Sequence, residues 1–236
     1  LDMAKERVNV GIIGAGSIAW THANGYTAVP ETMIAAFVDV MEERAAKLAE
    51  SFGVKAWYKD YREVLKRRDI QVISICTPPH LHARMAVEAA EAGKHFLVEK
   101  PMAINLKEAD KMVRAAKKSG VTAAVALQHR YKPDSEKIQG LLKEGYLGKL
   151  VQVKLRSLHQ FVRRPELAGH WYFKPEISGG GLLLQEGVHY IDLVSWLVGG
   201  EAKSVHARLT TISEGLPADV DDNALVICEY EGGVQA

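Results

Sequence analysis

Short apolar runs alternate with amphipathic stretches through the first half of the chain. Each run is bounded by turn residues and has the length of a buried strand. The predicted strands are 8–13, 33–38, 54–57, 70–76, 95–98 and 122–127. The first predicted helix ends at Ala28, and the others cover 41–52, 61–67, 81–92 and 106–119, the last with Asn105 as N-cap. Strands that alternate with helices predict an α/β fold with a doubly wound parallel sheet. Three helices are followed by a glycine in the C-cap position: Gly53, Gly93 and Gly120.

After Leu127 the hydrophobic pattern changes to longer runs in which apolar and polar residues alternate. These predict strands at 150–158, 204–212 and 224–230, with helices at 135–143 and about 188–198. We therefore expect residues 1–127 to form a Rossmann domain for NAD(P), and residues 128–236 to form an α+β domain with a mostly antiparallel open sheet for substrate and oligomer contacts. Glu231-Gly232-Gly233 is a hairpin signal close to the last residue, so we expect a truncated sheet.

Composition narrows the class of protein. The chain has 236 residues, of which 47% are hydrophobic and 25% charged, and a formal net charge of +1. This composition is typical of a globular protein. A net charge this small produces no strong electrostatic attraction to nucleic acid or anionic lipid. Two cysteines exclude a disulfide framework, and neither a membrane span nor a signal-peptide core is present. We expect a cytoplasmic protein.

A glycine loop follows the first predicted strand and opens the first predicted helix. Gly14 and Gly16 allow the tight turn and the close approach of a diphosphate, and Ala19 is small enough for helix–strand packing. The diphosphate would bind at the helix N-terminus, next to Ser17 and Ile18. In this context the loop predicts a dinucleotide site, against the alternative of a glycine turn without a ligand.

Asp39 ends the second predicted strand and favours NAD over NADP. Its carboxylate could accept the ribose hydroxyls, and it would repel a 2′-phosphate. Arg44, one helical turn further on, could still reach a 2′-phosphate, which keeps NADP as the alternative cofactor.

Three further stretches resemble the Gfo/Idh/MocA oxidoreductases, a family that includes inositol and glucose–fructose dehydrogenating enzymes. The most specific match is Glu99-Lys100-Pro101 at the end of the fifth predicted strand. Together with the glycine loop, the matching stretches run through nearly the whole chain in the order of the family. They are Cys76 to His82 with Ala92 to Pro101, then Gln128-His129-Arg130-Tyr131, and finally Gly179 to Leu197.

The resemblance implies roles for individual residues. Lys100 matches the catalytic lysine, Pro101 matches a tight turn that is often cis, and His189 matches the histidine that exchanges a proton with the substrate. Where the family often has Asp, this chain has Gln185, which lacks the charge that would raise the pKa of the histidine. The family usually continues for about another hundred residues that complete a sheet used in oligomer contacts. We therefore expect a homodimer or homotetramer in the full-length form.

The residues themselves suit hydride transfer to or from a carbinol. A partly desolvated Lys100 could polarise the substrate oxygen, and His189 is the right residue type for a general base near neutral pH. Gln185 lies four residues before His189, so both share a helix face and Gln185 could hold substrate hydroxyls. Asp192 could orient the ring of His189 or bond only to backbone.

Other candidates lie on loops that follow the strands. Arg130 either reaches the substrate or is structural, and His22 is interpreted as packing. The pair His80 and His82 lacks a third ligand, so we expect no metal. The cofactor candidates are Gly14, Gly16, Ser17, Ile18, Asp39, Thr77, Pro78, His82, Glu99, Lys100 and Gln128. The substrate candidates are Lys100, Arg130, Trp171, Tyr172, Gln185 and His189, with His159, Arg163 and Arg164 in the same polar loop.

The sequence thus predicts an NAD(P)-dependent dehydrogenase that acts on a hydroxyl or carbonyl of a sugar, polyol or sugar derivative. Two alternatives stay open. An NAD-dependent glycosidase of the same family would use the same residues without net NADH formation. A non-catalytic sensor would bind the dinucleotide, and such members have lost the lysine or the histidine, both of which this chain keeps.

Overall fold

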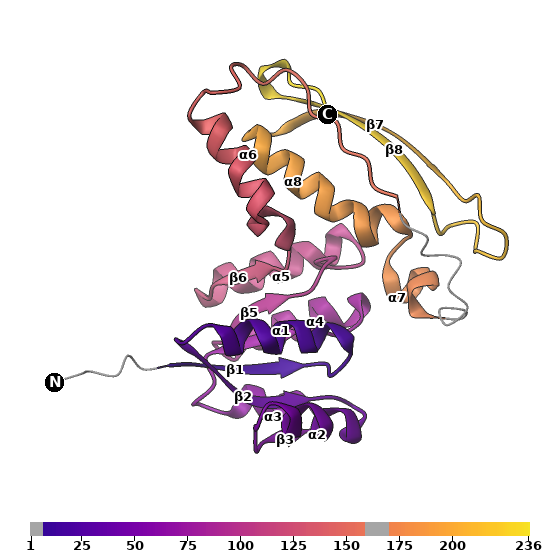
Figure 1. The fold of residues 1–236 in the computed structure, drawn as a ribbon. Helices are drawn as coiled ribbons and strands as arrows, with labels where there is room; N and C mark the ends of the chain where they lie inside the picture. The colour runs from indigo at the N-terminus through magenta and orange to yellow at the C-terminus, as the bar shows by residue number, and fades with distance from the viewer. Residues whose placement is uncertain (1–6, 159–169) are drawn as a thin grey trace. The chain divides into compact units, whose positions relative to one another are not determined.

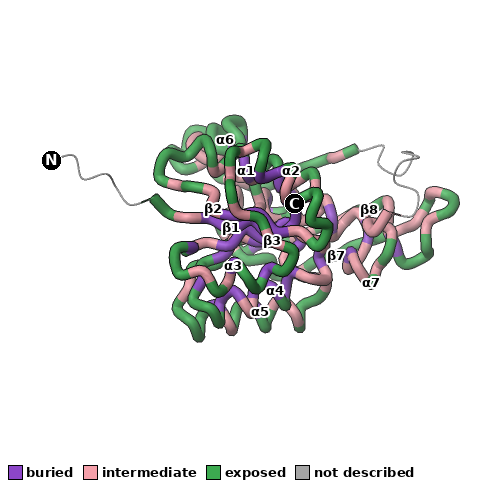
Figure 2. Tube along the Cα trace, turned by 90° about the horizontal axis from the view of Figure 1, so that it is seen from below, coloured by how far each residue is buried: buried purple, intermediate pink, exposed green. Residues whose placement is uncertain are grey.

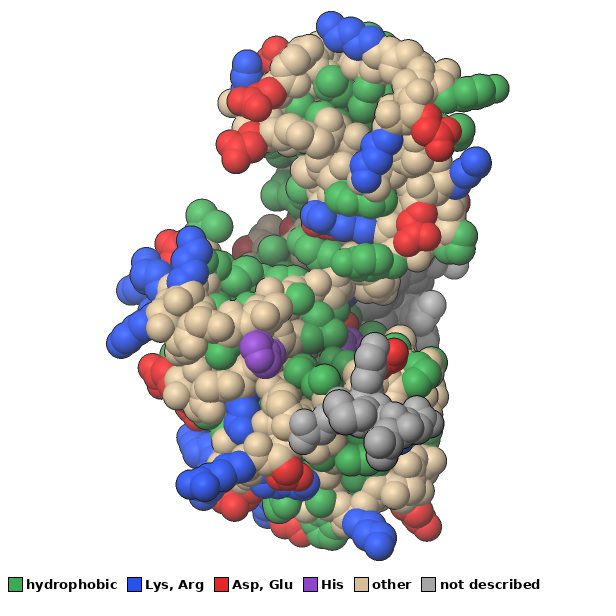
Figure 3. All heavy atoms as spheres, turned by 90° about the vertical axis from the view of Figure 1, so that its left-hand side faces the viewer, with side chains coloured by type: hydrophobic (Ala, Val, Ile, Leu, Met, Phe, Trp, Pro, Cys, Tyr) green, Lys and Arg blue, Asp and Glu red, His purple; other side chains and the backbone are tan. Residues whose placement is uncertain are grey.

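A computed structural model describes residues 7–158 and 170–236. The chain divides into two compact units, Leu1–Ala126 and Leu127–Ala236, whose elements are labelled in Figure 1. In the described residues, none of the helices has the length and apolar character needed to cross a membrane. Side chains of both charge signs are mixed over the face seen in Figure 3, as the net charge of +1 leads one to expect.

The first unit is built on a six-stranded sheet with the order β3-β2-β1-β4-β5-β6, and every neighbouring pair is parallel. This confirms the predicted doubly wound sheet. The strand order reverses between β1 and β4, and ligands bind at such a switch point, beyond the carboxyl ends of the strands. The strands are β1 (Val8–Ile13), β2 (Thr32–Val38), β3 (Trp57–Tyr58), β4 (Val72–Ile75), β5 (His95–Val98) and β6 (Ala123–Val125).

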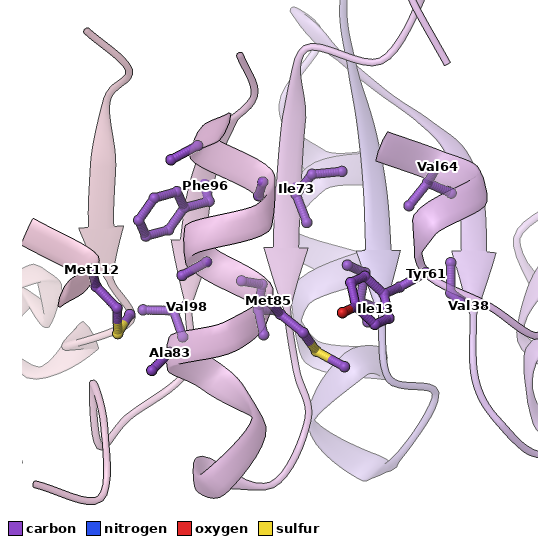
Figure 4. Packing of buried hydrophobic residues seen from close by; sticks show 14 of the residues in the cluster. Ile13, Val38, Tyr61, Val64, Ile73, Ala83, Met85, Phe96, Val98 and Met112 are labelled. Atoms are coloured by element: carbon purple, nitrogen blue, oxygen red, sulfur yellow. The ribbon is translucent and has the colours of Figure 1, made fainter. Parts of the chain in front are cut away.

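Helices cover both faces of this sheet. Buried residues of α1 and α2 pack with Val10, Ile12 and Phe37 in one core cluster. The other cluster joins Ile73 and Val98 to residues of α3, α4 and α5, and Figure 4 shows this packing at close range. The helices are α1 (Ser17–Ala28), α2 (Glu42–Ser51), α3 (Arg62–Lys66), α4 (His82–Glu91) and α5 (Leu106–Ser119), with a 3₁₀ turn η1 (Pro79–Leu81) before α4.

The ends of these helices follow from single residues. The Asn105 side chain accepts a hydrogen bond from the Glu108 N–H at 3.0 Å, which confirms the predicted N-cap of α5. Gly120 closes the same helix with a φ of 66°, and Gly53 and Gly93 also have positive φ. The third strand is later and shorter than predicted, because the Val54 N–H bonds back to Ala49 at the end of α2 instead of pairing in the sheet.

The second unit contains an antiparallel pair, β7 (Ala202–Thr210) and β8 (Asn223–Tyr230), which confirms the predicted antiparallel strands. Most residues of both strands are half-buried or exposed (Figure 2). A small core of Val194, Tyr230 and Val234 joins the sheet to α8. The helical elements are η2 (Gln128–Tyr131), α6 (Pro133–Lys143), η4 (Trp171–Phe173), α7 (Pro175–Ser178), a π-helical turn η5 (Leu183–Gly187), α8 (Val188–Val198) and η6 (Glu231–Gly233).

The predicted strand at 150–158 is wrong. Within it, only Gln152 forms a bridge, to Gln235, and the Val153 N–H donates to the Gln235 carbonyl. A strand needs a neighbour along its whole length, and the described residues supply one over a single bridge. The hairpin signal at 231–233 does form a turn, since Cys228 and Ala236 exchange two backbone hydrogen bonds across it.

Candidate cofactor and active site

The loops that hold the first unit's candidates leave one edge of its sheet. Gly14 follows β1, Asp39 follows β2, Thr77 follows β4 and Glu99 follows β5. Because all these strands are parallel, their carboxyl ends meet at the same edge. The fold therefore brings the predicted cofactor residues of this unit together.

The glycine loop has the shape that a diphosphate requires. Gly14 has a φ of 94°, and a Cβ at this position would lie 2.6 Å from the Cys76 carbonyl oxygen. At Gly16, which precedes α1, a Cβ would meet nothing within 4 Å, so the backbone faces open space. Ser17 and Ile18 form the first turn of α1, whose dipole favours an anion there. The residues present fit a dinucleotide.

Asp39 braces this loop. Its Oδ2 accepts from the Ala15 N–H at 2.7 Å and its Oδ1 accepts from the Met41 N–H at 2.9 Å. A carboxylate has about four acceptor positions. Two therefore remain, and the predicted contact with ribose hydroxyls would need them.

A hollow of about 360 Å³ lies between the glycine loop and α2. Arg44 and Lys47 line it from α2, together with Gly16, Ser17 and the exposed Trp20 of the loop and α1. The sequence singled out Arg44 alone, and Lys47 is added by its place three residues further along the same helix.

His82 lies in the interior, although the sequence placed it among the cofactor-binding residues. Its side chain has 0% exposure. Its Nε2 is 2.8 Å from the Thr77 carbonyl oxygen, and its Nδ1 is 2.9 Å from the Pro101 carbonyl oxygen. The imidazole thus contacts the backbone of two site loops and not the surface that a cofactor would touch.

A polar network supports the residues around Lys100. Glu99 is 7% exposed, and its Oε2 accepts from the Lys100 N–H at 3.1 Å. Its Oε1 lies 2.9 Å from His22 Nε2, while His22 Nδ1 lies 2.8 Å from the Ser74 hydroxyl. A carboxylate only accepts, so the Nε2–H of His22 donates to Glu99. The interpretation of His22 as packing is corrected by these contacts. The Lys100–Pro101 peptide is cis, as the resemblance implied.

In the second unit, His189 and Gln185 are both buried, with exposures of 3% and 4%. The ring of His189, on α8, stacks on that of His129 with centroids 4.5 Å apart. The Gln185 Nε2 donates to the Ser178 carbonyl at 2.6 Å. Gln185 belongs to the π-helical turn before α8, so the two residues are held by different helical geometries.

The Asp192 side chain pairs with a residue of η2. Its carboxylate forms a two-pronged ion pair with Arg130, in which Arg130 Nε donates to Oδ2 at 2.5 Å and Nη2 donates to Oδ1. The Asp192 hydrogen bond is the largest cause that raises the pKa of Arg130. The pair joins η2 to α8 inside the second unit, which supports the structural reading of Arg130 over the substrate-binding one.

The start of the π-helical turn is fixed by Asp221, which the sequence did not single out. Its carboxylate accepts from the Gly181 N–H at 3.1 Å and from the Leu183 N–H at 2.7 Å. A Cβ on Gly181 would lie 2.1 Å from the Asp221 carbonyl oxygen. No local signal could have found this cap, because the two partners are about forty residues apart.

Trp171 and Tyr172 stack with ring centroids 4.2 Å apart in η4. Gln128 is the first residue of η2. The remaining residues of the predicted sugar loop, His159, Arg163 and Arg164, lie outside the described residues. Over the described parts of the chain, no three His, Cys, Asp or Glu side chains are grouped so that they could hold a metal ion.

Two family models match the chain. One, described as the oxidoreductase family with an NAD-binding Rossmann fold, matches residues 8–127. The other, described as the GFO/IDH/MocA C-terminal domain, matches residues 135–236. The chain belongs to the Gfo/Idh/MocA oxidoreductase family. Its first unit is accordingly an NAD-binding Rossmann domain, which the geometry of the glycine loop fits.

Members of the Gfo/Idh/MocA family with known substrates are similar to this chain. A levoglucosan dehydrogenase from Pseudarthrobacter phenanthrenivorans is 31% identical over 97% of the chain, and a myo-inositol 2-dehydrogenase from Thermotoga maritima is 26% identical over 96%. The chain spans 66% of the length of each. A solved levoglucosan dehydrogenase in complex with NADH and levoglucosan is 31% identical, covers 98% of this chain and 65% of its own, and has a TM-score of 0.90.

Proposed function

We propose that the protein is an NAD-dependent oxidoreductase that transfers a hydride between the nicotinamide and a hydroxyl or carbonyl group of a sugar, polyol or sugar derivative. The observation that supports it most is Lys100, which an interior network holds at the carboxyl end of β5 in a domain that binds NAD. The similarity to dehydrogenases of levoglucosan and myo-inositol supports the substrate class.

The roles follow from the chemistry of the side chains. Bound NAD supplies the hydride acceptor, and the protein supplies position and charge. In the proposal, the ammonium group of Lys100 polarises the substrate oxygen and stabilises negative charge on it. His189 takes up or returns the hydroxyl proton, and its stacking on His129 holds the ring in one orientation. Gln185 positions substrate hydroxyls next to His189.

The proposed cofactor is NAD, because Asp39 keeps acceptor positions for ribose hydroxyls. Arg44 and Lys47 support NADP as the alternative, since both line the hollow beside the glycine loop. Titration of the protein with NAD and NADP separates the two. A clear preference for NADP that Arg44→Ala abolishes would transfer the assignment to the phosphorylated cofactor.

Replacement of Lys100 by Met tests the reaction. We expect turnover with a panel of inositols, aldoses and anhydrosugars to fall about a hundredfold or more, because the group that polarises the substrate oxygen is lost. The dissociation constant of NAD should change less than about threefold. The matched control is Lys111→Met on the exposed side of α5, which should leave turnover unchanged.

Three outcomes of this assay would contradict the proposal. A Lys100→Met variant with turnover near that of the wild type would remove Lys100 from the reaction. Release of a chromogenic aglycone without net NADH would identify the glycosidase chemistry instead. Tight NAD binding with no conversion of any panel member would favour a sensor.

A further inference from the structure

His82, the first residue of α4, connects the two loops that follow the neighbouring strands β4 and β5. One ring nitrogen faces the Thr77 carbonyl oxygen at 2.8 Å and the other faces the Pro101 carbonyl oxygen at 2.9 Å. Thr77 comes two residues after β4, and Pro101 directly follows Lys100. No part of His82 is exposed. The imidazole therefore contacts these two loops, and it is not accessible to a ligand.

The chemistry of the contact is selective for an imidazole. A backbone carbonyl only accepts, so the ring must donate: a neutral ring donates to one carbonyl at a time and an imidazolium to both. Burial is the largest influence on the pKa of His82 and lowers it, while the two carbonyls act in the opposite direction. An apolar side chain of similar size would fill the space and leave both oxygens without this donor.

We propose that His82 is a positioning residue for Lys100: its ring lies between the Thr77 and Pro101 carbonyls, donates to one of them at a time, and so ties the turn at Lys100–Pro101 to the loop after β4. This inference rests on the role of Lys100 in the proposed function. It replaces the earlier prediction that His82 binds the cofactor directly.

A second contact, from the opposite face of the sheet, supports this reading. His22 on α1 holds the side chain of Glu99, whose other oxygen accepts from the Lys100 N–H. The helices α1 and α4 belong to the two different core clusters, one on each side of the sheet. The residues before and after Lys100 are thus each contacted by a histidine, Glu99 by His22 and Pro101 by the buried His82. The backbone around Lys100 is therefore held by contacts from helices on both faces of the sheet.

The test compares His82→Leu, which keeps volume without a donor, with His82→Gln, which keeps two N–H groups on one nitrogen. The matched control is His95→Ala, because His95 also bonds a backbone group but lies at the opposite end of β5, where its Nδ1 accepts from the Thr122 N–H at 2.9 Å. Lysines are labelled by reductive methylation with ¹³C, and the Lys100 signal is identified by its loss in Lys100→Arg.

We expect His82→Leu to move the ¹³C signal of Lys100, and to lower kcat at least tenfold with less than a threefold change in NAD affinity. His82→Gln should restore part of both effects, and His95→Ala should produce neither. A folded His82→Leu variant with an unchanged Lys100 signal would overturn the proposal. The signal is read without turnover, so this result stands apart from a failure of the proposed reaction.

The wild-type protein provides a measurement that does not depend on how the variants fold. A ring N–H of His82 that donates to a buried carbonyl should exchange slowly with solvent and give a sharp ¹⁵N-correlated signal. The exposed His206 is the reference for fast exchange. Exchange of the His82 ring proton as fast as that of His206 would also overturn the bridge.

Discussion

Cys76 and Cys228 differ in what surrounds each thiol. Burial raises the pKa of Cys76 to about 12, with the nearby Glu99 acting in the same direction. Cys228 lies on β8 and is only half-buried. Because the thiolate is the reactive form, we expect a disulfide reagent at pH 8 to label Cys228 in the folded protein and Cys76 only after unfolding. In the Cys228→Ser variant, only the slow labelling of Cys76 should remain. Two thiols that react at the same fast rate would contradict the buried position of Cys76.

At the scale of residues, the sequence was informative where partners are close along the chain. The Asn105 cap was predictable because its acceptor lies three residues from the N–H that it satisfies. The contact of His22 with Glu99 spans 77 residues, and that of Arg130 with Asp192 spans 62. Spacing along a helix says nothing about such partners. The sequence offered His189 or the backbone as partners of Asp192, and the structure pairs it with Arg130.

Two glycines, one just before the π-helical turn and one inside α1, should respond in opposite ways to alanine. Gly181→Ala should cost about 2–3 kcal/mol of unfolding free energy, because its Cβ would overlap the Asp221 backbone that caps this helical start. Gly25→Ala should add about 0.5–1 kcal/mol, since Gly25 lies inside α1 with no atom within 4 Å of the new Cβ. Denaturant titrations measure both changes. Equal effects of the two substitutions would contradict the close approach of Asp221.

At the scale of elements, helices were predicted more closely than strands. The limits of α5 and α8 agree with the apolar period, because a helix satisfies its own backbone within one segment. A strand depends on a neighbour that the local pattern does not reveal. The run at 150–158 alternates well and still forms only one bridge. The π-helical turn at 183–187 has no apolar signature of its own and was missed.

For the whole molecule, each unit has its own core, so a ligand of the first unit should stabilise that unit selectively. At a hundredfold excess of NAD over its dissociation constant, the gain is about 2.7 kcal/mol. Hydrogen exchange followed by mass spectrometry should show slower exchange in β1 and β4 and no change in β7 and β8. Equal slowing in both sheets would indicate that the units unfold together.

The fold class was predictable because it depends on the alternation of strands and helices along the entire first half. An error in the bounds of one element does not change that alternation. The order of strands in the sheet was not predicted. Apolar periods identify strands, and they leave open which strands become neighbours. The family resemblance suggested the proposed roles of Lys100 and His189, which composition and spacing alone do not reveal.

The contact between Gly14 and Cys76 sets a boundary for engineering. The backbone of the loop after β1 rests directly on the backbone after β4, with no room for a methyl group between them. A side chain at position 14 would push the loop after β1 away from the loop after β4. Both loops carry residues of the proposed dinucleotide site. Libraries that aim to change cofactor preference can therefore vary Arg44 and Lys47, and should keep both this contact and the hydrogen bonds by which Asp39 holds the loop.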